Sequence, residues 1–146
     1  MTNIEIKRKL RKKETSEDFT PISTITEMLN KLPKEVFIDS SKTFCDNSAG
    51  NGNFLIQVLQ RKLDNGHDPL QALSTIYGVE LMEDNVIEMK ERLLELIPSN
   101  LHKKAKEIIN HNIICHDALT WDFENWKPPS ISKKILADEH KKYLKV

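Results

Sequence analysis

The sequence predicts an α/β domain in which three parallel strands alternate with helices. Short apolar segments at residues 43–45, 75–80 and 112–115 are typical of buried strands. Longer segments with apolar residues at helical spacing lie between them, at residues 54–63 and 84–97. This alternation is typical of a parallel sheet wound with right-handed crossovers. The last 25 or so residues, from Asp122, fit the pattern poorly, so only the first half of such a sheet is predicted.

The first predicted helix begins at Thr20 and Pro21. Thr is a favoured N-cap residue, and Pro is favoured at the first helical position. Apolar residues then follow at helical spacing up to Pro33, namely Ile22, Ile25, Met28, Leu29 and Leu32.

Turn residues and caps delimit the later helices. The helix at 54–63 ends in Asp64-Asn65-Gly66, and residues 69–73 favour one or two further helical turns. Asp84 is the expected cap of the next helix, which Pro98 ends, and another helix is predicted at about 100–110.

Composition limits the partners that this chain can have. It has 146 residues, which suits one domain, and 22 basic residues balance 22 acidic ones. Zero net charge argues against binding to DNA or anionic lipid by bulk electrostatics alone. The basic residues Lys7, Arg8, Lys9, Arg11, Lys12 and Lys13 are nevertheless clustered. Such a run can bind phosphate, but it is more typical of a solvated terminus, so residues 1–18 are predicted to be a mobile basic arm or a frayed helix.

Other features of the sequence predict a cytoplasmic, reduced protein. No apolar stretch approaches the roughly 20 residues that span a bilayer, and no apolar segment follows the basic N-terminus as in a signal peptide. The two cysteines, Cys45 and Cys115, suggest neither a disulfide framework nor a zinc site. Because both precede neighbouring strand ends, we expect them to lie close together as buried, inert thiols. His116 is expected to be a partly exposed loop residue.

Three candidate binding features follow the three predicted strands. The first is the turn from Asp46 to Gly52, where Gly50 and Gly52 permit positive φ and close approach of a ligand to the backbone. The helix that starts at Phe54 would point its amide groups at a carboxylate or phosphate there. In parallel sheets, ligands bind outside the carboxyl ends of the strands, so these features are expected to meet in one crevice.

The other two features are carboxylates. Glu80 ends the second strand, where an acidic side chain can accept hydrogen bonds from both hydroxyls of a ribose. It lies further beyond Gly52 than the roughly 20 residues of the usual dinucleotide-binding fingerprint, and the segment 64–68 accounts for the surplus. Asp117 follows the third strand and could accept a hydrogen bond from an adenine amino group.

Four segments together resemble the cofactor half of adenine-specific N6 DNA methyltransferases. They are Phe19-Thr20-Pro21, the turn from Asp46 to Phe54, Gly78-Val79-Glu80 and Cys115-His116-Asp117-Ala118. The resemblance covers residues 19–123 and implies a Rossmann-like, S-adenosylmethionine-dependent methyltransferase fold truncated to its first half. Residues 1–18 would then be an arm, and residues 124–146 a divergent C-terminal segment.

The resemblance also implies roles for individual residues. Thr20 and Pro21 would lie by the methionine end of S-adenosylmethionine, and Asp46 would face its amino group. Glu80 would take the ribose hydroxyls, Leu81 would flank the adenine, and Asp117 would hold the adenine amino group. The remaining cofactor-site residues of the matching motifs are Ala49, Gly50, Gly52, Phe54 and Ala118. Asn47 stands where the family usually has proline, which loosens the turn.

The catalytic motif of that family, [D/N/S]-P-P-[Y/F/W], does not occur in the sequence. Lys127-Pro128-Pro129-Ser130 has the prolines but neither the polar acceptor nor the aromatic ring that stacks on a flipped base. Residues 131–137 could form a degenerate fourth strand, followed by Asp138-Glu139-His140. The catalytic residues are therefore left unassigned.

Three functions remain open from the sequence. The chain is either a DNA adenine methyltransferase, a catalytically incomplete S-adenosylmethionine-binding or regulatory subunit, or a generic nucleotide-binding domain. Its expected partners are the cofactor, DNA, and a second chain or second copy, because the strand at 43–46 would otherwise expose an edge. The aromatic residues Trp121, Phe123 and Trp126 are predicted to cover that open edge of the sheet rather than to stack on a base.

Overall fold

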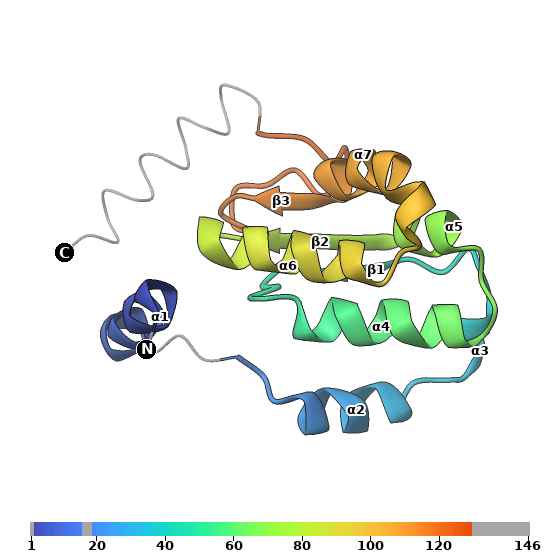
Figure 1. Cartoon of the computed structure of the whole chain (residues 1–146), viewed down its shortest axis with the longest axis horizontal. Coiled ribbons are helices and arrows are strands. Elements are labelled where there is room, and N and C mark those ends of the chain that lie inside the picture. The colour runs from blue at the N-terminus through green and yellow to red at the C-terminus, as the bar shows by residue number, and fades with distance from the viewer. Residues whose placement is uncertain (1, 16–18, 130–146) are drawn as a thin grey trace.

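The computed structural model describes residues 2–15 and 19–129 and contains a three-stranded parallel sheet (Figure 1). The strands are β1 (Phe44–Asp46), β2 (Ile76–Glu80) and β3 (Ile113–Cys115), and β2 lies between the other two. Both pairings are parallel. This confirms the predicted α/β class and the three parallel strands.

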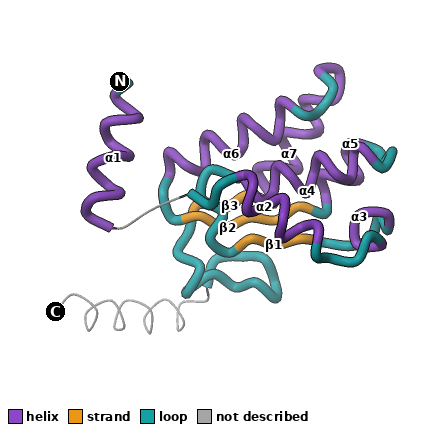
Figure 2. The backbone as a smooth tube through the Cα atoms, turned by 90° about the horizontal axis from the view of Figure 1, so that it is seen from below, coloured by secondary structure: helices purple, strands orange, loops and turns teal. Residues whose placement is uncertain are grey.

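Helices fill both crossovers of the sheet. The first crossover contains α4 (Asn53–Asp64) and α5 (Pro69–Ser74), and the second contains α6 (Glu83–Glu95), the short 3-10 helix η1 (Ser99–Leu101) and α7 (His102–Asn112). Because the strand order follows the chain order, right-handed crossovers place these helices on one face of the sheet, as Figure 2 shows. The residues between Gly52 and Glu80 that exceed the usual spacing are largely α5 and the turn before it.

Two helices precede the sheet. They are α2 (Ile22–Asn30), which packs against α4, and α3 (Glu35–Ile38), which leads into β1. The predicted N-cap of α2 is one residue early, because Pro21 itself occupies the cap position with ψ of 146°. The predicted cap of α6 is also wrong: Met82 is the N-cap residue, and Asp84 lies in the first turn, where its carboxylate binds Arg11.

The main core lies between the sheet and its helices. Leu55, Leu59, Met89 and Leu93 from α4 and α6 are fully buried there. Gly78 explains how closely α4 approaches β2, because a Cβ atom at that position would lie 2.7 Å from the Leu55 side chain. The glycine in the middle of β2 is therefore a packing requirement.

The opposite face of the sheet is covered by the aromatic segment that follows β3 (Figure 2). The ring of Trp126 meets Tyr77 of β2 edge-on with centroids 4.9 Å apart, and Trp121 packs edge-on against Trp126 at 5.5 Å. The Nε1 of Trp126 donates a hydrogen bond to the carbonyl of His111 at the end of α7 (2.8 Å). These aromatic residues thus cover the face beside β2 and not the edge of β1, because the strand order leaves that face without a helix.

The basic N-terminal segment forms a helix, α1 (Asn3–Thr15). Its arginines are not simply solvated: Arg8 and Arg11 form ion pairs with Asp84 of α6, and Arg8 also with Glu88. None of the described helices is long and apolar enough to cross a membrane. The predicted fourth strand at 131–137 and the tripeptide Asp138-Glu139-His140 lie outside the described residues.

Candidate functional site

The turn between β1 and α4 combines two positive φ angles with close packing. Its amide at Ala49 donates to the carbonyl of Val79 (3.1 Å), which fixes the turn to β2. Gly50 has φ of +55° and Gly52 has φ of +90°. A Cβ atom at position 52 would lie 2.7 Å from Cγ of Met89, so α6 can pack against the turn only when residue 52 is glycine.

A pocket of about 340 Å³ opens beside this turn. Its lining includes five residues that the sequence analysis assigned to the cofactor site, namely Thr20, Asp46, Ala49, Gly50 and Phe54. Residue 20 is held near the turn because Nδ2 of Asn53 donates to its carbonyl (3.2 Å). Segments that are distant in the sequence therefore form one wall.

Asp46 lies at the C-terminal end of β1 and lines the pocket. Burial raises the pKa of its carboxyl group above the ordinary value of 3.8; the Ser48 amide, 3.0 Å from Oδ1, opposes this shift, and the charge of Glu80 adds to it. Burial and the charge of Glu80 both disfavour the ionised form of Asp46. A cationic group that entered the pocket would offset both effects.

Glu80 is held by three donors at the C-terminal end of β2. Its Oε1 accepts from the amide of Gly50 (3.3 Å), and its Oε2 accepts from the amide of Met82 (3.2 Å) and from Nδ2 of Asn85 (2.9 Å). The structure thus brings together the acidic end of β2 and the glycine turn of β1. Adjacent strand ends make this contact possible, because Asp46 pairs with Gly78 in the β1–β2 register.

The third strand end lies at the same edge of the sheet. The amide of His116 donates to the carbonyl of Glu80 (3.1 Å), so Asp117 follows immediately beyond β2 and β3. Oδ1 of Asp117 accepts from the amide of Leu119 (2.9 Å). Leu81 is 59% exposed beside this turn. Glu80, Leu81, Asp117 and Ala118 do not line the described pocket, and neither do Pro21 and Gly52.

Three residues that were not predicted from the sequence also shape this site. The Phe19 ring lies 3.2 Å from where a Cβ atom of residue 50 would be, so it packs closely against the turn. Nη1 of Arg92 donates to the carbonyl of Asn51 (3.0 Å) and clamps the turn to α6. Asn85 is fully buried and binds Glu80. Only Phe19 carried a signal, since it belongs to the motif around Thr20.

The cysteines differ from the expectation. Both are free and exposed, and Cys45 is level with Tyr77 of β2, whereas Cys115 is level with Glu80. They flank β2 on opposite sides, which separates them by at least two strand spacings, or about 9 Å. Partial burial raises the pKa of each thiol. His116 is half-buried, as expected, and its Nε2 lies 2.9 Å from Oγ1 of Thr120.

Comparisons of the chain with protein-family models, curated proteins and solved structures find no match. Within residues 2–15 and 19–129, no three His, Cys, Asp or Glu side chains gather as a metal site would require. The residues at the strand ends offer the carboxylates of Asp46 and Glu80 and the backbone amides of the turn after β1.

Proposed function

We propose that this chain binds S-adenosylmethionine in the crevice at the ends of β1, β2 and β3. One observation carries the proposal: the pocket beside Gly50 contains Asp46 and is joined to Glu80 through the Gly50 amide. Its volume of about 340 Å³ lies within the roughly 300–1,000 Å³ that is usual for small-molecule sites.

The pocket suits the methionine end of the cofactor. Asp46 supplies a carboxylate for the cationic amino group, and Gly50 lines the same pocket. Gly52 is the N-cap residue of α4 and has no side chain to cap the helix. The first amides of α4 can therefore bind the methionine carboxylate, helped by the helix dipole.

The nucleoside would extend from this pocket across β2 to β3. Glu80 can accept a ribose hydroxyl on Oε1, where the 3.3 Å contact with the Gly50 amide is the longest of its three hydrogen bonds. Exposed Leu81 offers apolar surface to the adenine, and Asp117 offers an acceptor to the adenine amino group. These assignments are the ones that the resemblance implies.

Calorimetry with S-adenosylmethionine tests the binding proposal. Glu80→Gln keeps the size of the side chain but removes its charge, and we expect it to weaken binding about tenfold or more, because hydrogen bonds to charged groups are the stronger ones. Glu95→Gln, an exposed change at the far end of α6, is the matched control and should bind like the unaltered chain. No binding by the unaltered chain, or equal binding by the Glu80 variant, would contradict the proposal.

The proposed reaction is methyl transfer to adenine N6 in DNA, which rests on the resemblance of the cofactor motifs. The bound cofactor would supply an electrophilic methyl group, and this chain would hold it at the strand ends. Transfer of labelled methyl groups to unmethylated DNA by the purified chain would establish the activity.

A second candidate is a cofactor-binding subunit that requires a partner chain. It is favoured by β1, which pairs only with β2 among the described residues and so leaves its other edge without a neighbouring strand. Edges of this kind invite pairing with another chain. This function would be supported if the chain alone bound the cofactor without transferring methyl groups, and if adding a partner chain restored the transfer. Binding of a dinucleotide in place of S-adenosylmethionine would instead favour a generic nucleotide-binding domain.

A further inference from the structure

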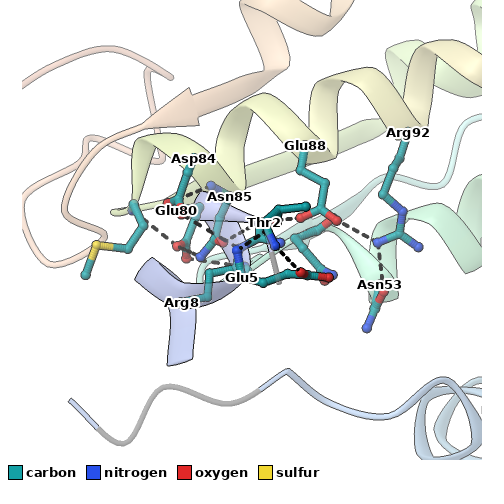
Figure 3. A network of polar contacts seen from close by, with 12 residues as sticks. Thr2, Glu5, Arg8, Asn53, Glu80, Asp84, Asn85, Glu88 and Arg92 are labelled. Carbon is teal, nitrogen blue, oxygen red and sulfur yellow. Dashed lines mark hydrogen bonds and ion pairs between the residues drawn. The ribbon is translucent and has the colours of Figure 1, made fainter. Parts of the chain in front are cut away.

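A polar network connects α1 to the carboxylate of Glu80 (Figure 3). Nη2 of Arg8 and Nη2 of Arg11 both donate to Oδ1 of Asn85, at 3.0 and 3.3 Å. Nδ2 of Asn85 in turn donates to Oε2 of Glu80 at 2.9 Å. Asn85 therefore joins the N-terminal helix to the acidic end of β2.

The same arginines are anchored by the first two turns of α6. Nη1 of Arg11 lies 3.0 Å from both carboxylate oxygens of Asp84, and Arg8 pairs with Glu88. Burial alone would raise the pKa of Asp84, but the hydrogen bonds and charges of Arg11 and Arg8, together with the Asn85 amide, lower it below 3.8. The ion pairs therefore form across the neutral range of pH.

Apolar packing does not explain why α1 lies at this position. Ile4, Ile6 and Leu10 are 57%, 44% and 57% exposed, whereas the side chains of Arg8 and Arg11 are only 22% and 12% exposed. The described side-chain contacts of α1 with α6 are thus made by the two arginines with the charged groups of Asp84 and Glu88 and the amide of Asn85. A helix that served only to extend the core would instead bury its apolar residues.

The orientation of the Asn85 side-chain amide is fixed by its surroundings. Asn85 is fully buried, so its amide cannot turn to water, and two guanidinium groups occupy its oxygen. Its nitrogen is consequently directed at Oε2 of Glu80, which leaves Oε1 facing the amide of Gly50. Arg8 also lies over the ring of Phe19, 5.3 Å from its centroid, and so contacts a wall of the pocket.

We propose that Arg8 and Arg11 are positioning residues that orient Glu80, through Asn85, toward the ribose hydroxyls of a bound nucleoside. This inference rests on the proposed binding of S-adenosylmethionine. It gives α1 a role in recognising the cofactor, although neither arginine is expected to touch it. Because the network consists of partly exposed charges, its effect should weaken at high ionic strength.

The test uses calorimetry with S-adenosylhomocysteine, which is the cofactor without its transferable methyl group. Its affinity is compared with that of the 2′-deoxyadenosine counterpart, which lacks one ribose hydroxyl. The variant Arg8→Gln/Arg11→Gln removes both guanidinium groups, and Lys7→Gln/Lys9→Gln removes two exposed charges from the same helix as the control. We expect the unaltered chain and the control to prefer the ribose form. The arginine variant should bind S-adenosylhomocysteine about tenfold more weakly, with little change for the deoxy ligand.

The outcomes separate the two proposals. If the unaltered chain binds neither ligand, both proposals fail. If it binds and discriminates but the arginine variant discriminates equally well, or loses both ligands equally, only the positioning role is overturned. Should the variant not fold, a salt titration of the unaltered chain gives the same answer: affinity for the ribose form should fall more steeply than affinity for the deoxy form, and parallel curves would overturn the inference.

Discussion

The pKa of Asp46 depends on its burial at the end of β1 and on the charge of Glu80. Both raise the pKa of its carboxyl group, while the hydrogen bond from the Ser48 amide lowers it. Without cofactor, the folded chain favours the protonated form of Asp46, because its pKa is raised. This group therefore stabilises the folded chain below pH 3.8, and the contribution is lost as the pH rises through the raised pKa. A cationic ligand would reverse that preference.

The affinity for S-adenosylmethionine should therefore rise with pH through the raised pKa of Asp46. The cationic amino group pairs only with the ionised carboxylate, so binding releases a proton from the fraction that is still protonated. Calorimetry from about pH 4 to about pH 7 measures this dependence, which spans the acidic side of neutrality. Asp46→Asn should bind more weakly and with a flat profile. A flat profile for the unaltered chain would contradict the pairing.

Gly52 provides a test of the turn itself. Gly52→Ala adds both a left-handed alanine and a clash with Met89, so we expect the free energy of unfolding to fall by about 2–4 kcal/mol. Gly66→Ala is the control, because Gly66 has φ of +83° but open space around it, and should lose only about 1–2 kcal/mol. Denaturant unfolding measures both variants. Equal losses would show that the packing of α6 on the turn is unimportant.

At the level of elements, α4 is fixed at both ends. Its N-terminus carries the glycine turn, and near its C-terminus Lys62 is fully buried, with Nζ donating to the carbonyl of Lys42 (2.5 Å) and to Oγ1 of Thr75 (2.6 Å). Lys62 thereby joins the segments that lead into β1 and β2. Burial lowers the pKa of its ammonium group from 10.5, although the charge of Asp39 opposes the shift.

Lys62→Met should alter the pH dependence of stability. Between the lowered pKa and 10.5 the unfolded chain holds more protons than the folded one, so the stability of the unaltered chain rises with pH relative to the variant. At pH 7 we expect Lys62→Met to change the free energy of unfolding by less than about 2 kcal/mol. Lys62→Ala, which also leaves a cavity, should cost about 3 kcal/mol or more. Parallel pH curves for the unaltered chain and the Met variant would contradict the buried charge.

The elements with a clear apolar period were predictable, and those without one were not. The stripes of Leu and Val in α4 and α6 mark a face that packs on the sheet, which is why their positions were found to within two residues. α1 carries no buried stripe, since it is held by Arg8 and Arg11. Ion pairs between residues more than 70 positions apart leave no local signal in a single sequence.

For the whole molecule, the order of the strands determines which face of the sheet the helices leave open, and the sequence alone did not predict that face. Chain order β1-β2-β3 puts the helices on one face, and Trp126 fills the other by packing on Tyr77. The aromatic cluster was visible in the sequence, but its location depended on which face the crossovers left open. The same topology brings three strand ends to one edge, so the convergence of Gly50 and Glu80 could be predicted, whereas the part played by Asn85 could not.

The central proposal is that one ligand contacts three neighbouring strand ends at once. The most direct test is to titrate isotope-labelled protein with S-adenosylmethionine and follow each backbone amide by nuclear magnetic resonance. The amides of Gly50, Leu81 and Asp117 should shift together with one dissociation constant, and Gly66 should stay unmoved. If the ligand causes no shifts, or shifts at only one of these strand ends, the proposed site is contradicted.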